Sequence, residues 1–70
     1  MINQTIQEAL NAQINAEQYS AQLYLAMSVF LENKNFKGFA KWLRVQAEEE
    51  TSHAMKLVDY VLERGGRVEL

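Results

Sequence analysis

Apolar residues recur at alternating steps of four and three along most of this chain. In the first half these positions are Leu10, Ile14, Glu17, Ala21, Tyr24, Ser28 and Leu31. In the second half they are Phe39, Leu43, Gln46, Glu50, His53, Leu57 and Tyr60. This spacing is typical of a helix packed into a bundle. The pattern therefore predicts an all-α chain with two helices, at about residues 4–33 and 36–64.

Polar residues at the start and middle of the chain predict where these helices begin and end. The first helix is expected to begin near Asn3 or Thr5, because Thr5 to Glu8 fits a capping box that satisfies free backbone N–H groups. Residues 33–35 predict a polar turn. Asn35 is expected to cap the second helix.

The C-terminal residues predict a helix end followed by a tail. Gly65-Gly66 supplies the left-handed residue that commonly ends a helix. Residues 67–70 then form an extended tail. With no linker or repeat in the sequence, residues 1–70 are expected to form one domain, an antiparallel helical hairpin.

Length, composition and charge narrow the function classes. The chain has 70 residues, of which 49% are hydrophobic, and is short for burying enough surface alone. Its net charge is −2 without a basic patch, so nucleic acid is not an expected partner. The polar start lacks a signal core and no apolar run approaches membrane-spanning length, which predicts a cytoplasmic protein without a membrane partner. There is no cysteine, which excludes disulfides.

Three residues with metal-ligand chemistry interrupt the two apolar seams. Glu50 and His53 are three residues apart and share one helix face. In an antiparallel hairpin Glu17 lies roughly 27 Å from the turn and Glu50 roughly 22 Å, at about 1.5 Å rise per residue. All three side chains are therefore expected to converge at mid-height. A buried carboxylate is costly unless it is neutralised, and a metal ion would neutralise it.

Two carboxylates and one imidazole suit Fe(II), Mn(II) or Zn(II). Three ligands on one hairpin are too few to close a site, which predicts a homo-oligomer, at least a dimer of hairpins. Two hairpins would present two seam glutamates and two Glu-x-x-His pairs. That is the donor set of the di-metal carboxylate bundles.

The candidate residues also have ordinary structural explanations. A lone Glu-x-x-His on a helix is common and usually faces solvent, but Glu17 at a matching height favours metal binding. Tyr24 is more often a core aromatic, although its hydroxyl is also able to hydrogen-bond a ligand. Glu48 and Glu49 read as a solvated face. Glu49 is also close enough to Glu50 to line an accessory cation site.

Several motifs resemble the first half of a prokaryotic-type ferritin subunit. They are Glu17 with Tyr24-Leu25-Ala26-Met27, Phe36-Lys37-Gly38-Phe39-Ala40, Glu49-Glu50-Thr51-Ser52-His53-Ala54 and Arg64-Gly65-Gly66-Arg67. The resemblance covers essentially the whole chain. It implies a ferritin-like four-helix bundle and iron storage, in which subunits oxidise Fe(II) with oxygen at a di-iron centre and mineralise Fe(III) inside a hollow cage.

The resemblance also implies a role for each matching residue. Glu17 is similar to the first-helix ligand of one iron, and His53 to the imidazole on that same iron. Glu50 is similar to the carboxylate that bridges both irons. Tyr24 matches the tyrosine beside the centre, which makes it the candidate catalytic residue. Glu49 matches a carboxylate that helps to bind a third iron in bacterial members.

A ferritin subunit also has a long crossover and two further helices, which this sequence lacks. Three explanations stay open: a fragment of a longer subunit, two hairpins that rebuild the bundle as in the similarly built encapsulated ferritins, and a remnant without metal. Self-pairing is favoured because an isolated hairpin would expose both seams. The favoured function is ferroxidase and iron storage. The alternatives are a non-catalytic assembly module, and a manganese or peroxide-reducing enzyme, since other divalent cations suit the same ligands.

Overall fold

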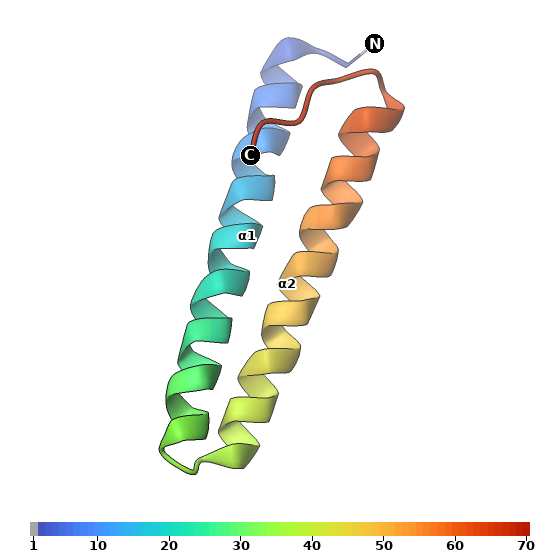
Figure 1. Cartoon of the computed structure of the whole chain (residues 1–70). Helices are drawn as coiled ribbons and strands as arrows, with labels where there is room; N and C mark the ends of the chain where they lie inside the picture. The colour runs from blue at the N-terminus through green and yellow to red at the C-terminus, as the bar shows by residue number, and fades with distance from the viewer. Residues whose placement is uncertain (1) are drawn as a thin grey trace.

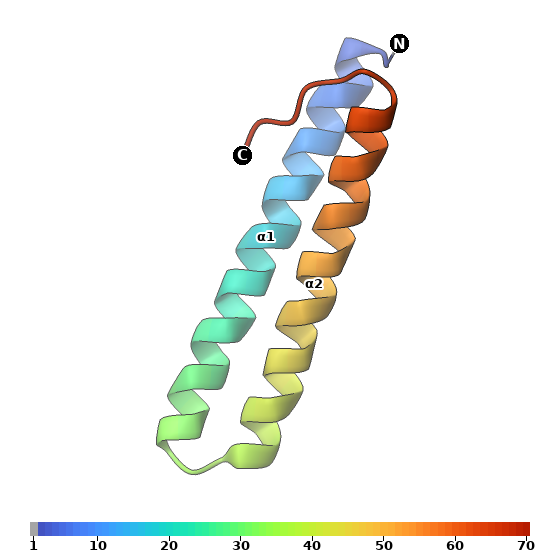
Figure 2. The ribbon, with the colours of Figure 1, turned by 45° about the vertical axis from the view of Figure 1, so that its right-hand side comes forward.

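The computed structural model describes residues 2–70 as two long helices joined by a tight turn (Figure 1). Helix α1 spans Gln4–Asn33 and helix α2 spans Lys37–Glu63. They run antiparallel and side by side in both views (Figures 1 and 2), in a rod of 49 × 15 × 12 Å. The predicted all-α helical hairpin is confirmed. The predicted domain of residues 1–70 includes Met1, which lies outside the described residues.

Neither helix within residues 2–70 combines the length and apolar character needed to cross a membrane. The accessible surface of the hairpin is 5260 Å². A compact monomer of 8.1 kDa is expected to expose about 4,500 Å². Because a two-helix rod is a single layer thick, it buries only one stripe of each helix and leaves the remaining apolar side chains in contact with solvent.

Helix α1 is capped by Asn3 at its N-terminus. The Asn3 Oδ1 atom accepts hydrogen bonds from the N–H groups of Thr5, at 2.7 Å, and Ile6, at 3.3 Å. Thr5 therefore lies inside the helix, and the capping box predicted from Thr5 to Glu8 is wrong. Asn3 has the extended backbone angles of an N-cap residue, which direct its short side chain at the first free N–H groups of the helix. Thr5 is one of the residues whose N–H it accepts from.

The turn between the helices is made by Asn35, whose φ is 66°. The N–H of Asn35 donates to the carbonyl of Glu32 at 3.1 Å, and the N–H of Phe36 donates to that of Leu31 at 2.9 Å. These two bonds form a Schellman motif that ends α1. Asn35 was predicted to cap α2, and that prediction is wrong: the N-cap is Phe36, without a side-chain bond. Asparagine suits either role, and the left-handed turn takes it here.

Helix α2 ends in the same way at Gly65, whose φ is 73°. The N–H of Gly65 donates to the carbonyl of Leu62, and the N–H of Gly66 donates to that of Val61. The predicted left-handed glycine is confirmed at Gly65. The chain then turns back and runs along α1 to its C-terminus (Figure 2).

The core lies along the line where the two helices meet. Its fully buried centre consists of Ile14, Ala54 and Val61, and four partly buried residues pack around it: Leu10, Leu57, Val58 and Val68. Towards the turn most of the buried side chains are small, among them Ala21, Ser28 and Ala40. There the buried Ser28 hydroxyl donates to the carbonyl of Ala40 at 2.5 Å, so this polar group is satisfied.

Most of the residues that α2 buries against α1 lie one position later in the sequence than the predicted seam residues. The buried residues of α2 are Ala40, Leu43, Ala47, Ala54 and Val61. Phe39 and Tyr60, which were predicted to lie on the seam, are 68% and 40% exposed. The alanines allow the helices to approach closely. A residue one position earlier points about 100° away, so these large side chains form a second, uncovered apolar face.

Candidate metal centre

The two helices bring the three predicted ligands together at mid-height. Glu17 comes from α1, whereas Glu50 and His53 come from adjacent turns of α2. One donor atom of each residue lies within 4.8 Å of the donor atoms of the other two. The Nδ1 atom of His53 lies 3.5 Å from Oε2 of Glu17 and 4.0 Å from Oε1 of Glu50. Heptad spacing and helical rise therefore predicted the right neighbours.

Glu17 carries the feature that most favours a cation at this point. Its Oε1 atom accepts a hydrogen bond from Nε2 of Gln13 at 2.8 Å. Its Oε2 atom is buried, and among residues 2–70 no amide, hydroxyl or ring N–H donates to it. Buried carboxylate oxygens without a partner are rare because they lose hydration without replacement. Gln13 was missed by the sequence reasoning, although its spacing of four from Glu17 was the available signal.

The neighbouring Glu17 and Glu50 carboxyl groups shift each other's pKa values in opposite directions. The interaction with Glu50, together with the hydrogen bond from the Gln13 amide, lowers the pKa of Glu17 from its ordinary 4.5. The interaction with Glu17 raises the pKa of Glu50 above 4.5, and partial burial and the Glu17 charge add to the rise. Glu50 therefore gives up its proton less readily than Glu17 does. A bound cation would compete with that proton.

The donor set fits a divalent metal ion in chemistry and nearly in distance. Ligand bonds to a small divalent cation such as zinc are about 2.0–2.2 Å long, so two donors on one ion lie at most about 4.4 Å apart. The three donor atoms lie within 4.8 Å of one another, so the most distant pair needs to approach by only about 0.4 Å. The His53 side chain is 54% exposed, so the site opens on the uncovered face, where further ligands have access.

Two predicted site residues lie outside this three-residue cluster. Tyr24 is half-buried on α1, two turns beyond Glu17 and on the same side of the helix. Glu49 is exposed on α2 and does not contribute to the cluster. Their roles beside the centre and at an accessory cation site stay predictions.

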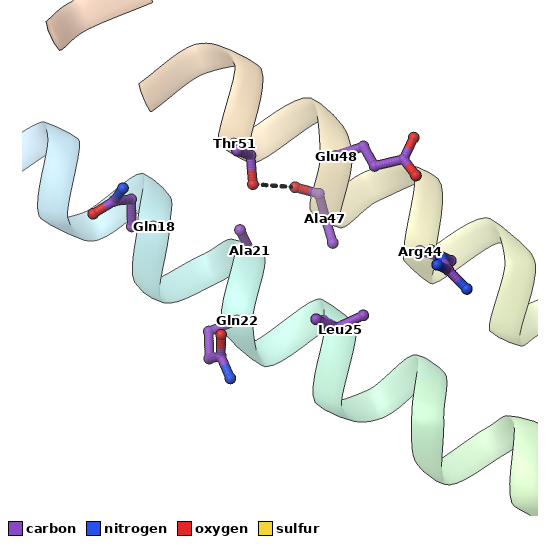
Figure 3. A pocket seen from close by; sticks show the side chains of 8 residues that line it. All are labelled: Gln18, Ala21, Gln22, Leu25, Arg44, Ala47, Glu48 and Thr51. Carbon is purple, nitrogen blue, oxygen red and sulfur yellow. Dashed lines mark hydrogen bonds between the residues drawn. The ribbon is translucent and has the colours of Figure 1, made fainter. Parts of the chain in front are cut away.

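A separate groove, lined by none of the three metal ligands, runs between the helices (Figure 3). Its lining consists of Gln18, Ala21, Gln22, Leu25, Arg44, Ala47, Glu48 and Thr51. The short side chains of Ala21 and Ala47 leave this space open. The Thr51 hydroxyl donates to the Ala47 carbonyl at 3.0 Å and is satisfied within its own helix.

Comparison with known proteins relates this geometry to a family. A family model described as the ferritin-like domain matches residues 7–70. The chain belongs to the ferritin family. The bacterial non-heme ferritin of Bacteroides fragilis (strain 638R) is 47% identical over 66 residues, which cover 94% of this chain and 42% of that protein. The bacterial non-heme ferritin of Staphylococcus aureus (strain USA300) is 36% identical over 69 residues, which cover 99% of this chain and 42% of that protein.

Solved ferritin structures have the same hairpin. An Archaeoglobus fulgidus ferritin engineered into a closed form matches with a TM-score of 0.95 and 56% identity, over 100% of this chain and 43% of that one. Chlorobium tepidum ferritin matches with a TM-score of 0.93 and 43% identity, over 99% of this chain and 42% of that one. This chain thus spans less than half the length of these ferritins.

Proposed function

We propose that the chain binds Fe(II) through Glu17, Glu50 and His53 and takes part in iron storage as a ferroxidase. The observation that carries this proposal is the buried Oε2 atom of Glu17, for which residues 2–70 supply no hydrogen-bond donor and which lies 3.5 Å from the His53 imidazole. Membership of the ferritin family supports iron as the metal. Anionic oxygen donors stabilise Fe(III) over Fe(II) and so favour the loss of an electron from iron to dioxygen.

A second hairpin is proposed to complete the site, because one hairpin supplies only three donors. Di-iron bundles take a glutamate from each of two helices and a Glu-x-x-His pair from each of the other two. Two copies of this chain supply that set. Four large apolar side chains stand exposed at the two ends of the metal-bearing face: Ile6 and Tyr60 near the chain ends, and Phe39 and Trp42 near the turn. Covering them would bury the surface that the single layer leaves open.

The remaining candidate residues have proposed roles around this centre. Glu50 is proposed to be the ligand shared by two irons, because its Glu-x-x-His motif matches that of the ferritin family. Tyr24 is proposed to stand beside the centre as a hydrogen-bonding or redox-active phenol. Glu49 is proposed to bind an accessory iron near the surface, where its exposure leaves it accessible.

An anaerobic Fe(II) titration of the purified chain, followed by exposure to air, tests this function. We expect saturation near one iron per chain, which is two per pair of hairpins, and an Fe(III) absorbance that develops on adding oxygen. Glu50→Gln should abolish both signals, whereas Glu48→Gln removes the same charge from an exposed position and should preserve them. Equal binding by wild type and Glu50→Gln would overturn the proposal.

Metal binding should release a proton and weaken as the pH falls. The raised pKa of Glu50 means that this carboxyl still holds its proton at pH values somewhat above the ordinary 4.5. Because a metal ligand must be deprotonated, the proton competes with the cation, and the competition ends only once the pH exceeds the raised pKa. Calorimetric titration with Zn²⁺ in buffers of different ionisation enthalpy should count this proton. A proton count that does not change with pH would contradict the expectation.

A further inference from the structure

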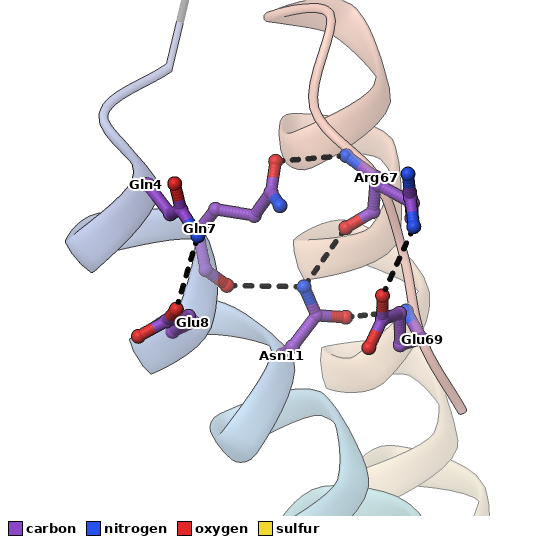
Figure 4. Close-up of polar contacts among 6 residues, drawn as sticks. All are labelled: Gln4, Gln7, Glu8, Asn11, Arg67 and Glu69. Carbon is purple, nitrogen blue, oxygen red and sulfur yellow. Dashed lines mark hydrogen bonds and ion pairs between the residues drawn. The ribbon is translucent and has the colours of Figure 1, made fainter.

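Three amide side chains on α1 face the C-terminal tail of the chain. They are Gln7, Asn11 and Asn15, which we call the amide ladder, and they are spaced four residues apart. The tail consists of residues 67–70. It lies beside Gln7 and Asn11 of the ladder (Figure 4). The last rung, Asn15, lies on a side of α1 away from Glu17, because two residues turn the helix by about 200°.

The ladder contacts the tail through main-chain atoms. Gln7 Oε1 accepts from the N–H of Arg67 at 2.9 Å, and Asn11 Nδ2 donates to the carbonyl of Arg67 at 2.8 Å. Asn11 Oδ1 accepts from the N–H of Glu69 at 2.6 Å, and Asn15 Nδ2 donates to the carbonyl of Glu69 at 2.8 Å. Every backbone polar group of these two tail residues is therefore bound by a side-chain amide, as it would be in a β-sheet by another strand.

We propose that the amide ladder is a binding site for extended main chain, and that its resident occupant is the tail. The spacing fits this role. Four residues advance a helix by about 6.0 Å, and two residues advance an extended chain by about 6.6–6.8 Å. One amide per turn therefore meets every second tail residue. Each step also rotates about 40° around α1, which limits such a ladder to a few rungs, and Tyr19 occupies the next position after Asn15.

The path into the ladder is shaped by Gly66. A Cβ atom at this residue would lie 2.8 Å from Cγ1 of Val61 and 2.9 Å from Oε1 of Gln7, both too close. The chain therefore passes directly over the first rung because this position has no side chain. Val68, between the two bound residues, packs its side chain on the core.

The tail side chains on either side of Val68 do not contact the ladder. Among the residues that the structure describes, the Arg67 and Glu69 side chains form an ion pair only with each other, at 3.5 Å, and are 78% and 68% exposed. An exposed pair of this kind contributes little. Recognition at these two positions is therefore of the backbone. The ladder ties the end of α2 to α1 while the metal-bearing face stays open for a partner.

Amide hydrogen exchange in the full chain, measured by NMR, tests the ladder. Among the described residues, the N–H groups of Val68 and Leu70 have no hydrogen-bond partner, so protection should alternate along the tail. We expect Arg67 and Glu69 to exchange about tenfold more slowly than these two. Asn11→Ala should remove the protection of Glu69, whose N–H loses its acceptor, while the N–H of Arg67 keeps its bond to Gln7.

Two further variants separate recognition of the backbone from recognition of side chains. Gln7→Glu keeps the oxygen acceptor and should preserve the protection of Arg67, whereas Gln7→Ala should lose it. Glu69→Ala removes only the exposed ion pair and should leave the pattern unchanged. Uniform exchange across the tail of the wild type would overturn the proposal, and so would a Glu69→Ala variant that loses protection as fully as Asn11→Ala.

Discussion

Replacing Glu17 by leucine is expected to abolish metal binding and to make the metal-free chain more stable. The first effect follows because the cluster loses one of three donors. The loss in affinity should exceed the roughly 10–100-fold that removal of an outer hydrogen-bond partner typically costs a metal site. The second follows because a buried oxygen without a donor is replaced by an apolar side chain of similar size. Zn²⁺ and anaerobic Fe(II) titrations, with urea unfolding, measure the two effects.

Glu8→Leu is the matched control for this experiment. It makes the same change on the same helix at an exposed position. It should leave metal affinity unaltered, and it should not raise the urea midpoint, because Glu8 has no buried atom to relieve. A Glu17→Leu chain that gains stability but still takes up iron as the wild type does would rule out a metal site at Glu17. It would favour the assembly-module alternative instead.

Replacing Phe39 by glutamate is expected to separate paired hairpins without unfolding them. Phe39 is 68% exposed within one hairpin, so the substitution leaves the core intact. In a pair it would bury an unpartnered charge, which costs about 3–5 kcal/mol and weakens pairing by roughly two to four orders of magnitude. Sedimentation should show the mass fall from twice 8.1 kDa to a single chain while circular dichroism keeps its helical signal.

Iron binding should fail along with pairing, because the site would lose the donors of the second hairpin. Val45→Glu provides the control: Val45 is also an exposed apolar residue of α2, at 42%, but its spacing of six from Phe39 places it on the other side of the helix. It should pair and bind iron normally. A Phe39→Glu chain with unchanged mass would show that this face is not the interface.

The predicted centre came from spacing along the chain, and the three residues do meet. Positions 17, 50 and 53 follow from the heptad pattern and a fixed rise per residue, which are local properties of any helix. Prediction was weaker wherever two roles compete for one residue type. Asn35 suits an N-cap and a left-handed turn equally, and Asn3 competed with Thr5 for the same N–H groups. Which role each takes depends on the path of the backbone on both sides.

Periodicity and local backbone preferences determined four features from the sequence. These are the two helices, their antiparallel pairing, the left-handed Gly65 and the convergence of Glu17, Glu50 and His53. The tertiary structure decided the rest. It placed alanines rather than Phe39 and Tyr60 between the helices, because close approach depends on both surfaces at once. It also left Glu17 Oε2 without a donor within the described part of the chain, and it set the tail on the amide ladder. These features join residues up to 60 positions apart, and no local pattern records such contacts.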